Sequence, residues 1–406
     1  MRAMFVFAWL CLGTSLFAAE QAGLSTSGPI APAKLVALAA DGSLTLEAGG
    51  KKSTYPPGNL VSFGKFTESD RGPLVVLADG SWVVADLTAL SADEYRIDSR
   101  LLGELSLPRG SVRGIIFRLP AEKPARDRLI DRLLTRKDPH DLLVLANGDE
   151  LAGQTSQHKI DADTGDESLQ FVAQGGKEPI SLPVPKIAAL AFDPVLIDAA
   201  VPQGAHFLMG LRDGSRLVVT SVALSAGRYE LTLASGLKLR LDKDALESDV
   251  VAWQPMGHGV VYLSDLLTSG YKHIPFLSTP WPFENDRQDL GGRLRASGAM
   301  YVKGIGMHST ARLAYELPEG YRQFQAEIAL DDAAGDRGSV IFRVFTNAGD
   351  ATWKTAYESP IVRGGEAPRS IHADLVGVKR IALIVDFAER GDEQDHAVWL
   401  NARLVK

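Results

Sequence analysis

A short phrase recurs between residues 38 and 215 and limits the possible folds more than any other feature of the sequence. It is an apolar run that ends in Asp-Gly or Asn-Gly. These dipeptides reach the left-handed backbone region at little cost, so they favour tight hairpins between alternating strands. Repetition of the phrase indicates tandem copies of one small antiparallel unit. The copies are Leu38–Ser43, Val76–Ser81, Val144–Asp149 and Gly210–Ser215.

A second phrase follows most of these copies. It is an alternating strand that ends in Leu-Pro or Leu-Asp, and then a closing apolar strand. One copy reads Leu105–Pro108 and Val112–Phe117, and the next reads Ile180–Pro183 and Ile187–Phe192. Each copy therefore holds about four or five short strands, which is typical of a small, strongly bent barrel of the Sm-like or SH3-like kind.

One helical segment divides the repeats. Pro124 near its start and Asp138-Pro139 after its end are the usual helix punctuation. We predict repeat units 1 and 2 at residues 34–120, a helical spacer at 121–139, and units 3 and 4 at 140–255. The spacer is expected to pack on a neighbouring barrel, with a membrane-surface role as the alternative. Its apolar stripe consists of Leu129, Ile130, Leu133 and Leu134.

The first residues indicate the compartment. Arg2 is the one charge before Glu20, and an apolar core followed by small residues lies between them. We predict a secretory signal peptide at residues 1–19, with an uncleaved anchor as the alternative, and a flexible lead-in at 20–33. Cys11 is the single cysteine, so cleavage would leave no disulfide and no thiolate ligand. The expected location is periplasmic or extracellular, with no membrane span after cleavage.

Residues 256–406 form a further β-rich segment. Its strands alternate apolar and polar residues and are separated by loops rich in Gly, Asp and Pro. This pattern predicts a two-sheet sandwich, so the whole chain is expected to be all-β. The alternating stretches are Ala311–Leu317, Phe324–Leu330, Ser339–Phe345, Arg380–Asp386 and Ala397–Leu404.

Five phrases in this segment also resemble the NPCBM/NEW2 family, a carbohydrate-binding module type associated with glycosyl hydrolase family 98 and related to carbohydrate-binding module family 51. Tyr301–Ser309 resembles its "kGiGxHs" signature, and Asp395–Trp399 resembles its "DHadW" ending. The resemblance implies a galactose-binding-like jelly roll that binds sugars, with galactose-containing glycans as the precedent. The other matching phrases are Val261–Leu266, Tyr315–Leu317 with Tyr321–Phe324, and Leu330–Asp332 with Gly338–Val344.

Tryptophans are the first candidates for sugar contacts, because sugar sites combine an aromatic platform with a few polar groups. Trp281 and Trp353 lie in polar, loop-like contexts, so either can be the platform or can simply pack. Trp399 lies within a strand pattern and is expected in the core.

Polar candidates come from the two signature phrases and one acidic turn. His308 follows a Gly-Ile-Gly stretch and either faces the ligand or fixes the loop. Asp395 and His396 can hydrogen-bond sugar hydroxyls or hold the structure together. A weak Ca²⁺ site, or else a solvated turn, is expected at Asp331, Asp332 and Asp336. No other cofactor is expected.

Composition and motifs narrow the function. The net charge of −7 and the lack of any run of five or more Lys/Arg residues disfavour a nucleic-acid partner. The nucleophile elbow, zinc-protease, P-loop and dinucleotide motifs are all missing from the sequence. We therefore expect an exported, non-catalytic protein that binds a glycan or polysaccharide, with the repeats as spacer or as a surface for an envelope partner. The alternatives are a structural or protein-interaction protein of the cell envelope, and an enzyme of unrecognised type.

Overall fold

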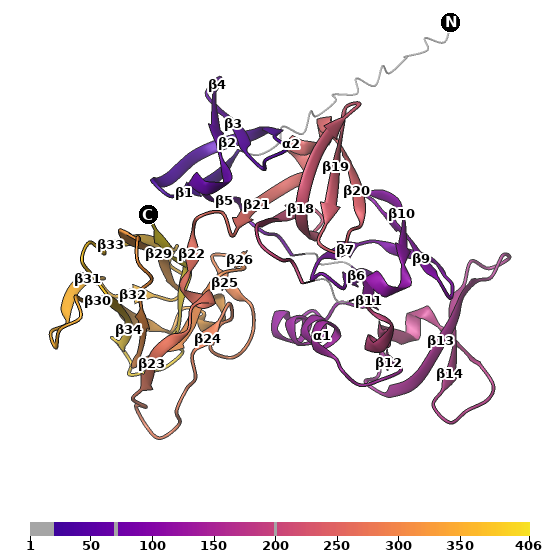
Figure 1. Cartoon of the computed structure of the whole chain (residues 1–406). Coiled ribbons are helices and arrows are strands. Elements are labelled where there is room, and N and C mark those ends of the chain that lie inside the picture. The colour runs from indigo at the N-terminus through magenta and orange to yellow at the C-terminus, as the bar shows by residue number, and fades with distance from the viewer. Residues whose placement is uncertain (1–19, 69–71, 199–200) are drawn as a thin grey trace, which may run out of the picture.

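The computed structural model describes residues 20–68, 72–198 and 201–406, and antiparallel strands dominate it (Figure 1). The all-β prediction is confirmed. An N-terminal region extends to Met256, and a separate sandwich begins at Val261. The predicted signal peptide at 1–19 lies outside the described residues. Within the described ranges, no helix has the length and apolar character needed to cross a membrane.

The N-terminal region is built on a network of 18 hydrogen-bonded strands, beside a three-stranded sheet of β8 (Asp86–Leu90), β9 (Glu94–Ser99) and β10 (Gly103–Pro108). The 18 strands are β1 (Gln21–Ser25), β2 (Gly28–Leu38), β3 (Leu44–Ala48), β4 (Lys51–Tyr55), β5 (Leu60–Gly64), β6 (Leu74–Leu77), β7 (Trp82–Val84), β11 (Val112–Ile116), β12 (Asp141–Leu145), β13 (Glu150–Ile160), β14 (Glu167–Ala173), β15 (Ile180–Pro183), β16 (Ile187–Ala191), β17 (His206–Leu211), β18 (Arg216–Ser225), β19 (Arg228–Leu233), β20 (Lys238–Asp242) and β21 (Val250–Met256).

The same order of elements occurs four times in this region. Each copy begins with a hairpin, continues with further strands, and has a 3₁₀ turn just before its closing strand or the short helix α2 (Leu246–Asp249). The structure thus contains the repeat seen in the sequence, while the Sm-like or SH3-like identity of each unit stays a prediction. The four turns are η1 (Pro57–Asn59), η2 (Arg109–Ser111), η3 (Val184–Lys186) and η5 (Lys243–Ala245).

The Asp-Gly-Ser turns also join two of the copies. Gly80 and Gly214 have φ of 86° and 91°, the left-handed conformation that the sequence predicted. The serine after each glycine then bonds the other unit. Ser81 Oγ accepts from the Val218 N–H, and Ser215 Oγ accepts from the Val84 N–H, both at 2.9 Å.

The predicted flexible lead-in at 20–33 is wrong. Its residues form β1 and the start of β2, and β1 pairs with both β2 and β5. Small residues here allow close approach of strands. A Cβ on Gly23 would lie 3.1 Å from the backbone oxygen of Ser62.

The predicted spacer helix is present as α1 (Lys123–Thr135). Ile130 and Leu133 are buried in a small apolar core that includes Leu74 of β6. Asp127 is also buried on this helix, with 1% of its surface exposed. The periodicity of the sequence gives no sign of this buried carboxylate.

The C-terminal sandwich has two antiparallel sheets of six strands each. The first holds β22 (Val261–Tyr262), β24 (Glu284–Asn285), β27 (Gly304–His308), β29 (Gln323–Leu330), β33 (Arg369–Asp374) and β35 (His396–Val405). The second holds β23 (Thr268–His273), β28 (Ala311–Glu316), β30 (Ser339–Asn347), β31 (Lys354–Glu358), β32 (Val362–Arg363) and β34 (Arg380–Phe387). Trp399 is fully buried between them, edge-to-face on Phe342 at 4.9 Å, as expected for a core residue.

A hairpin of the sandwich, β25 (Leu294–Ala296) and β26 (Ala299–Tyr301), lies against the N-terminal region. The Arg295 guanidinium donates to Glu68 at 2.6 and 2.9 Å and to Asp127 at 2.7 and 2.8 Å. Burial alone would raise the pKa of Asp127, but hydrogen bonds from Arg295 and Arg293 outweigh it and hold the pKa at about 2. We call this group the interface cluster: Glu68, Asp127, Asp131, Arg293 and Arg295.

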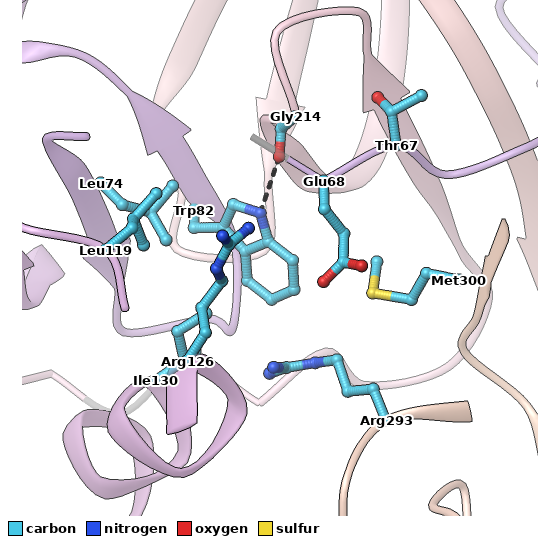
Figure 2. Close-up of a pocket in the computed structure, with 10 residues that line it drawn as sticks. All are labelled: Thr67, Glu68, Leu74, Trp82, Leu119, Arg126, Ile130, Gly214, Arg293 and Met300. Atoms are coloured by element: carbon cyan, nitrogen blue, oxygen red, sulfur yellow. Dashed lines mark hydrogen bonds between the residues drawn. The ribbon is translucent and has the colours of Figure 1, made fainter. Parts of the chain in front are cut away.

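Figure 2 shows the neighbourhood of this cluster, with Arg293 and Met300 reaching from the sandwich toward Trp82 and Glu68 of the N-terminal region. The small cavity here is about 20 Å³, enough for one water molecule. Trp82 donates from Nε1 to the Gly214 carbonyl at 2.9 Å. The two regions therefore contact each other directly through Trp82, Arg293 and Met300.

Candidate binding site at one end of the sandwich

Two adjacent strands bring the candidate site together. β27 ends at His308 and β35 begins at His396, and the antiparallel register pairs these two residues directly. The segment between β23 and β27 supplies Trp281 and Asp289 to the same place. Trp281, Asp289, His308 and His396 are called the histidine cluster below.

The aromatic rings of this cluster are in contact. Trp281 stacks on His308 with ring centroids 4.5 Å apart and an interplanar angle of 8°. His396 stands edge-on to both rings, with centroids 5.5 Å from His308 and 6.1 Å from Trp281. Trp281 remains half-buried, whereas both histidines are almost fully buried.

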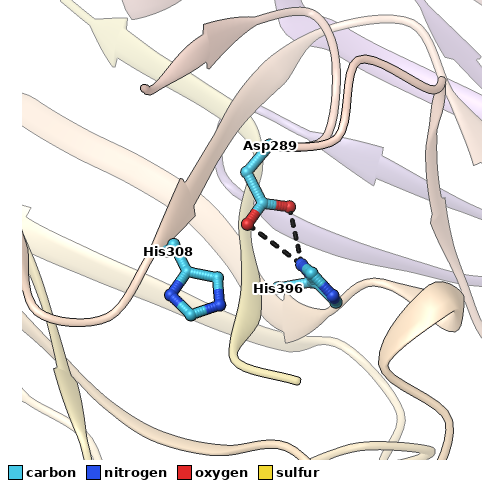
Figure 3. Close-up of side chains that lie close together, drawn as sticks. All are labelled: Asp289, His308 and His396. Carbon is cyan, nitrogen blue, oxygen red and sulfur yellow. Dashed lines mark hydrogen bonds and ion pairs between the residues drawn. The ribbon is translucent and has the colours of Figure 1, made fainter. Parts of the chain in front are cut away.

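Hydrogen bonds fix the orientation of both imidazoles, and Figure 3 shows those between His396 and Asp289. His396 donates from Nδ1 to the two carboxylate oxygens of Asp289 at 2.9 and 3.0 Å. His308 donates from Nδ1 to the Ser309 carbonyl at 3.0 Å. Within the described part of the chain, no hydrogen bond reaches Nε2 of either ring. Each histidine thus keeps one ring nitrogen for a bound molecule.

The pKa values of the two rings shift in opposite directions. Burial lowers the pKa of His308, so this ring is neutral near pH 7 and Nε2 carries a lone pair. Burial also opposes a charge on His396, but the hydrogen bond and charge of Asp289 outweigh it and raise the pKa of that ring. Each free Nε2 accepts a hydrogen bond when its ring is neutral and donates one when the ring is protonated, and a sugar hydroxyl can supply either partner.

His273 holds the tryptophan in place. Its Nδ1 accepts from the Trp281 backbone N–H at 3.1 Å, and its Nε2 donates to the Ser309 carbonyl at 3.0 Å. Sequence reasoning missed both His273 and Asp289. His273 ends a strand and Asp289 lies in an irregular segment, so no local pattern marks either one.

Comparison with known proteins identifies the family of the C-terminal sandwich. Residues 259–405 match the family model described as the NPCBM/NEW2 domain. This segment of the chain is an NPCBM/NEW2 domain. The family resemblance inferred from the five phrases is confirmed, and the domain type is a carbohydrate-binding module.

A relative from Renibacterium salmoninarum, named "Putative endo-alpha-N-acetylgalactosaminidase", is 29% identical over 148 residues. The match covers 35% of this chain and 10% of that protein. The matched segment therefore spans about a tenth of the length of this relative.

Two solved structures of CBM51 modules are also similar. One is the module from Clostridium perfringens GH95 in complex with methyl-galactose, with 22% identity over 36% of this chain and 99% of that chain, at a TM-score of 0.31. The other is the tandem pair from the Streptococcus pneumoniae family 98 glycoside hydrolase, with 11% identity over 65% and 87%, at a TM-score of 0.31.

The predicted site residues of the NPCBM/NEW2 domain divide into two places. Trp281, His308 and His396 meet in the histidine cluster. Trp353 lies just after Asn347, the end of β30 that is distant from the histidine cluster. The Trp353 ring faces the Arg380 guanidinium, 5.4 Å from the ring centroid. A strand of this length separates the two ends by roughly 25 Å. Both tryptophans thus cannot serve one sugar ring, and the cluster favours Trp281 as the platform.

Asp395 lies at the right end of the domain but points inward. It has no exposed surface, and its carboxylate accepts from Ser309 Oγ at 2.6 Å and from the Ser339 N–H at 2.8 Å. Burial raises the pKa of Asp395 to about 6. Of the two roles expected for Asp395, this arrangement favours holding the structure together, because the carboxylate is fully buried and both oxygens accept from protein donors.

The three predicted calcium ligands do not form a ligand group in the described residues, where the one such group found is Asp289, His308 and His396. Asp331 accepts from the Ala333 and Arg295 N–H groups, and Asp332 accepts from the Gly298 N–H. These carboxylates fix the loop against the hairpin. The solvated-turn alternative fits the exposed Asp332, but it does not fit Asp331, which has 3% of its surface exposed.

Proposed function

We propose that this chain is an exported, non-catalytic protein that binds glycans at the histidine cluster of its NPCBM/NEW2 domain. The supporting observation is the junction of the half-buried Trp281 ring with two buried imidazoles, each of which keeps Nε2 free of protein hydrogen bonds in the described residues. An indole presents a face to sugar C–H groups, and the imidazoles serve hydroxyls.

An apolar rim beside the cluster extends the surface available to a chain of sugars. Phe276 and Leu277 lie in the loop between His273 and Trp281, with 55% and 86% of their surfaces exposed. Phe276 packs edge-on against Phe387 at 5.8 Å. Exposed apolar groups around a polar centre are typical of binding surfaces.

A glycan array with the full chain tests the proposal, with galactose-terminated glycans as the first class. Wild type should bind at least one glycan, and Trp281→Ala should reduce its affinity at least tenfold, because the platform is lost. Trp353→Ala is the matched control, since it removes an equally large ring from the other end of the domain and should bind like wild type.

The result that overturns the proposal is a folded wild-type chain that binds no glycan on the array. That result would favour the alternative of a cell-envelope structural or interaction protein. Equal losses in the two tryptophan variants would instead refute the position of the site.

A further inference from the structure

The histidine cluster also has the composition of a metal centre. One donor atom from each of Asp289, His308 and His396 lies within 4.8 Å of the donor atoms of the other two. All three side chains are buried, with exposed fractions of 5%, 3% and 4% in that order. They come from three separate segments of the domain, so the fold rather than local sequence brings them together.

The kind of donor decides the kind of ion. Two imidazole nitrogens and one carboxylate oxygen suit Zn²⁺, Co²⁺, Ni²⁺ or Cu²⁺. Ca²⁺ and Mg²⁺ prefer oxygen ligands, and here the two histidines would give them none. We propose that Asp289, His308 and His396 bind one divalent transition-metal ion, with Zn²⁺ as the expected occupant.

The hydrogen bond of His308 matches this use, because Nδ1 donates to a backbone carbonyl and Nε2 is left for an ion. Such a partner orients an imidazole in a metal site and makes the ring more basic. His396 and Asp289 bond each other through Nδ1, so an ion bound between them takes the place of the proton on that nitrogen. Donor atoms in a tetrahedral zinc site are roughly 3.3 Å apart, given bonds of about 2.0–2.1 Å. The donor atoms, which lie within 4.8 Å of one another, must therefore approach by up to about 1.5 Å to bind one ion.

Three protein ligands leave a tetrahedral ion one position for water or for a hydroxyl of a bound molecule. His273 does not fill that position, because both of its ring nitrogens are engaged by Trp281 and Ser309. Metal binding by Asp289, His308 and His396 rests on their donor atoms alone and does not depend on glycan binding.

Isothermal titration of Zn²⁺ into tag-free, chelator-treated full chain tests the site. We expect one ion per chain with a micromolar or lower dissociation constant, and at least tenfold weaker binding in His308→Ala and in His396→Ala. His372→Ala is the matched control, because His372 is an exposed histidine on β33 of the same domain. It should bind zinc like wild type.

A fluorescence measurement avoids the risk that a histidine variant misfolds. Trp281 stacks on His308, so Cu²⁺ in the site should quench part of the emission of wild type, and Trp281→Phe should lose that part. No stoichiometric zinc binding by wild type, or quenching that is the same in Trp281→Phe, would overturn the inference. Zinc binding by a chain that binds no glycan would refute the proposed function alone.

Discussion

The interface cluster and the histidine cluster are both largely buried groups that contain ionisable side chains. They differ in how many of their polar atoms have hydrogen-bond partners within the protein. In the interface cluster, Arg295 and Asp127 use their charged atoms on each other and on Glu68 and Arg293. In the histidine cluster, His308 and His396 each bond through Nδ1 only, as far as the described residues show. The first arrangement is complete without a ligand, and the second leaves donor atoms for one.

The largest effect should come from the interface cluster. Arg295→Met removes the guanidinium that joins the sandwich to the N-terminal region and leaves Glu68 and Asp127 without it. Removing one partner of a buried pair typically costs ~3–5 kcal/mol. Urea unfolding of the full chain should show a loss of this size.

Arg132→Ala is the control for that experiment. Arg132 lies on α1 like Asp127, but it pairs with Glu150 where both side chains are more than 40% exposed. Exposed pairs contribute little, so a loss below ~1 kcal/mol is expected. If both variants lose the same stability, the interface cluster does not differ from an ordinary surface pair.

A smaller loss is expected when the support of the histidine cluster is removed. Asp395→Ala leaves the Ser339 N–H and the Ser309 hydroxyl buried without their acceptor. Such groups cost ~1–3 kcal/mol when unsatisfied, so the free energy of unfolding should fall by about 2–3 kcal/mol. Thermal and urea unfolding measure it. Glu393→Ala, an exposed carboxylate in the same loop, should be neutral, and a neutral Asp395→Ala would contradict the role of Asp395 as a brace.

Acid should weaken the interface cluster. The pKa of Asp127 is about 2 in the folded chain, against an ordinary value of 3.8. A lowered carboxyl pKa gives stability that is present above pH ~4 and is lost as the pH falls toward ~2. The shift corresponds to roughly 2 kcal/mol. The charged groups that influence this carboxylate are Arg293, Arg295, Arg287 and Glu68.

The measurement compares wild type with Asp127→Asn in urea at pH 6, 4 and 2.5. The stability difference between the two should shrink by about that amount as the pH falls. A difference that stays constant would show that the charge of Asp127 does not stabilise the contact.

The sequence predicted the elements of this protein better than their contacts. Asp-Gly and Asn-Gly turns impose their backbone locally, so all four turns were recognised from dipeptides. The bond from Ser81 to Val218 joins residues 137 positions apart, and no local pattern encodes it. The prediction of a flexible lead-in failed for a related reason. Small residues are found both in flexible segments and where strands approach closely, and the sequence does not show whether a partner strand is present.

The candidate site shows the same limit. His308 and His396 were found because they stand in signature phrases, whereas Asp289 and His273 become visible only when distant loops meet. For Asp395 the sequence left a sugar contact and a structural role both open, because it gives a residue type but not the direction of the side chain.

The variant with the smallest expected loss of stability, His308→Gln, distinguishes a binding cluster from a structural one most clearly. His308→Gln removes a neutral ring whose one hydrogen bond goes to the Ser309 carbonyl, and that carbonyl still accepts from His273. No charge and no acceptor is left unpaired, so the unfolding free energy should change by less than ~1 kcal/mol. Zinc affinity should nevertheless fall at least tenfold in the same variant. If His308→Gln instead destabilises the chain as much as Asp395→Ala does, the histidine cluster is part of the structural framework, and its free ring nitrogens do not mark a binding site.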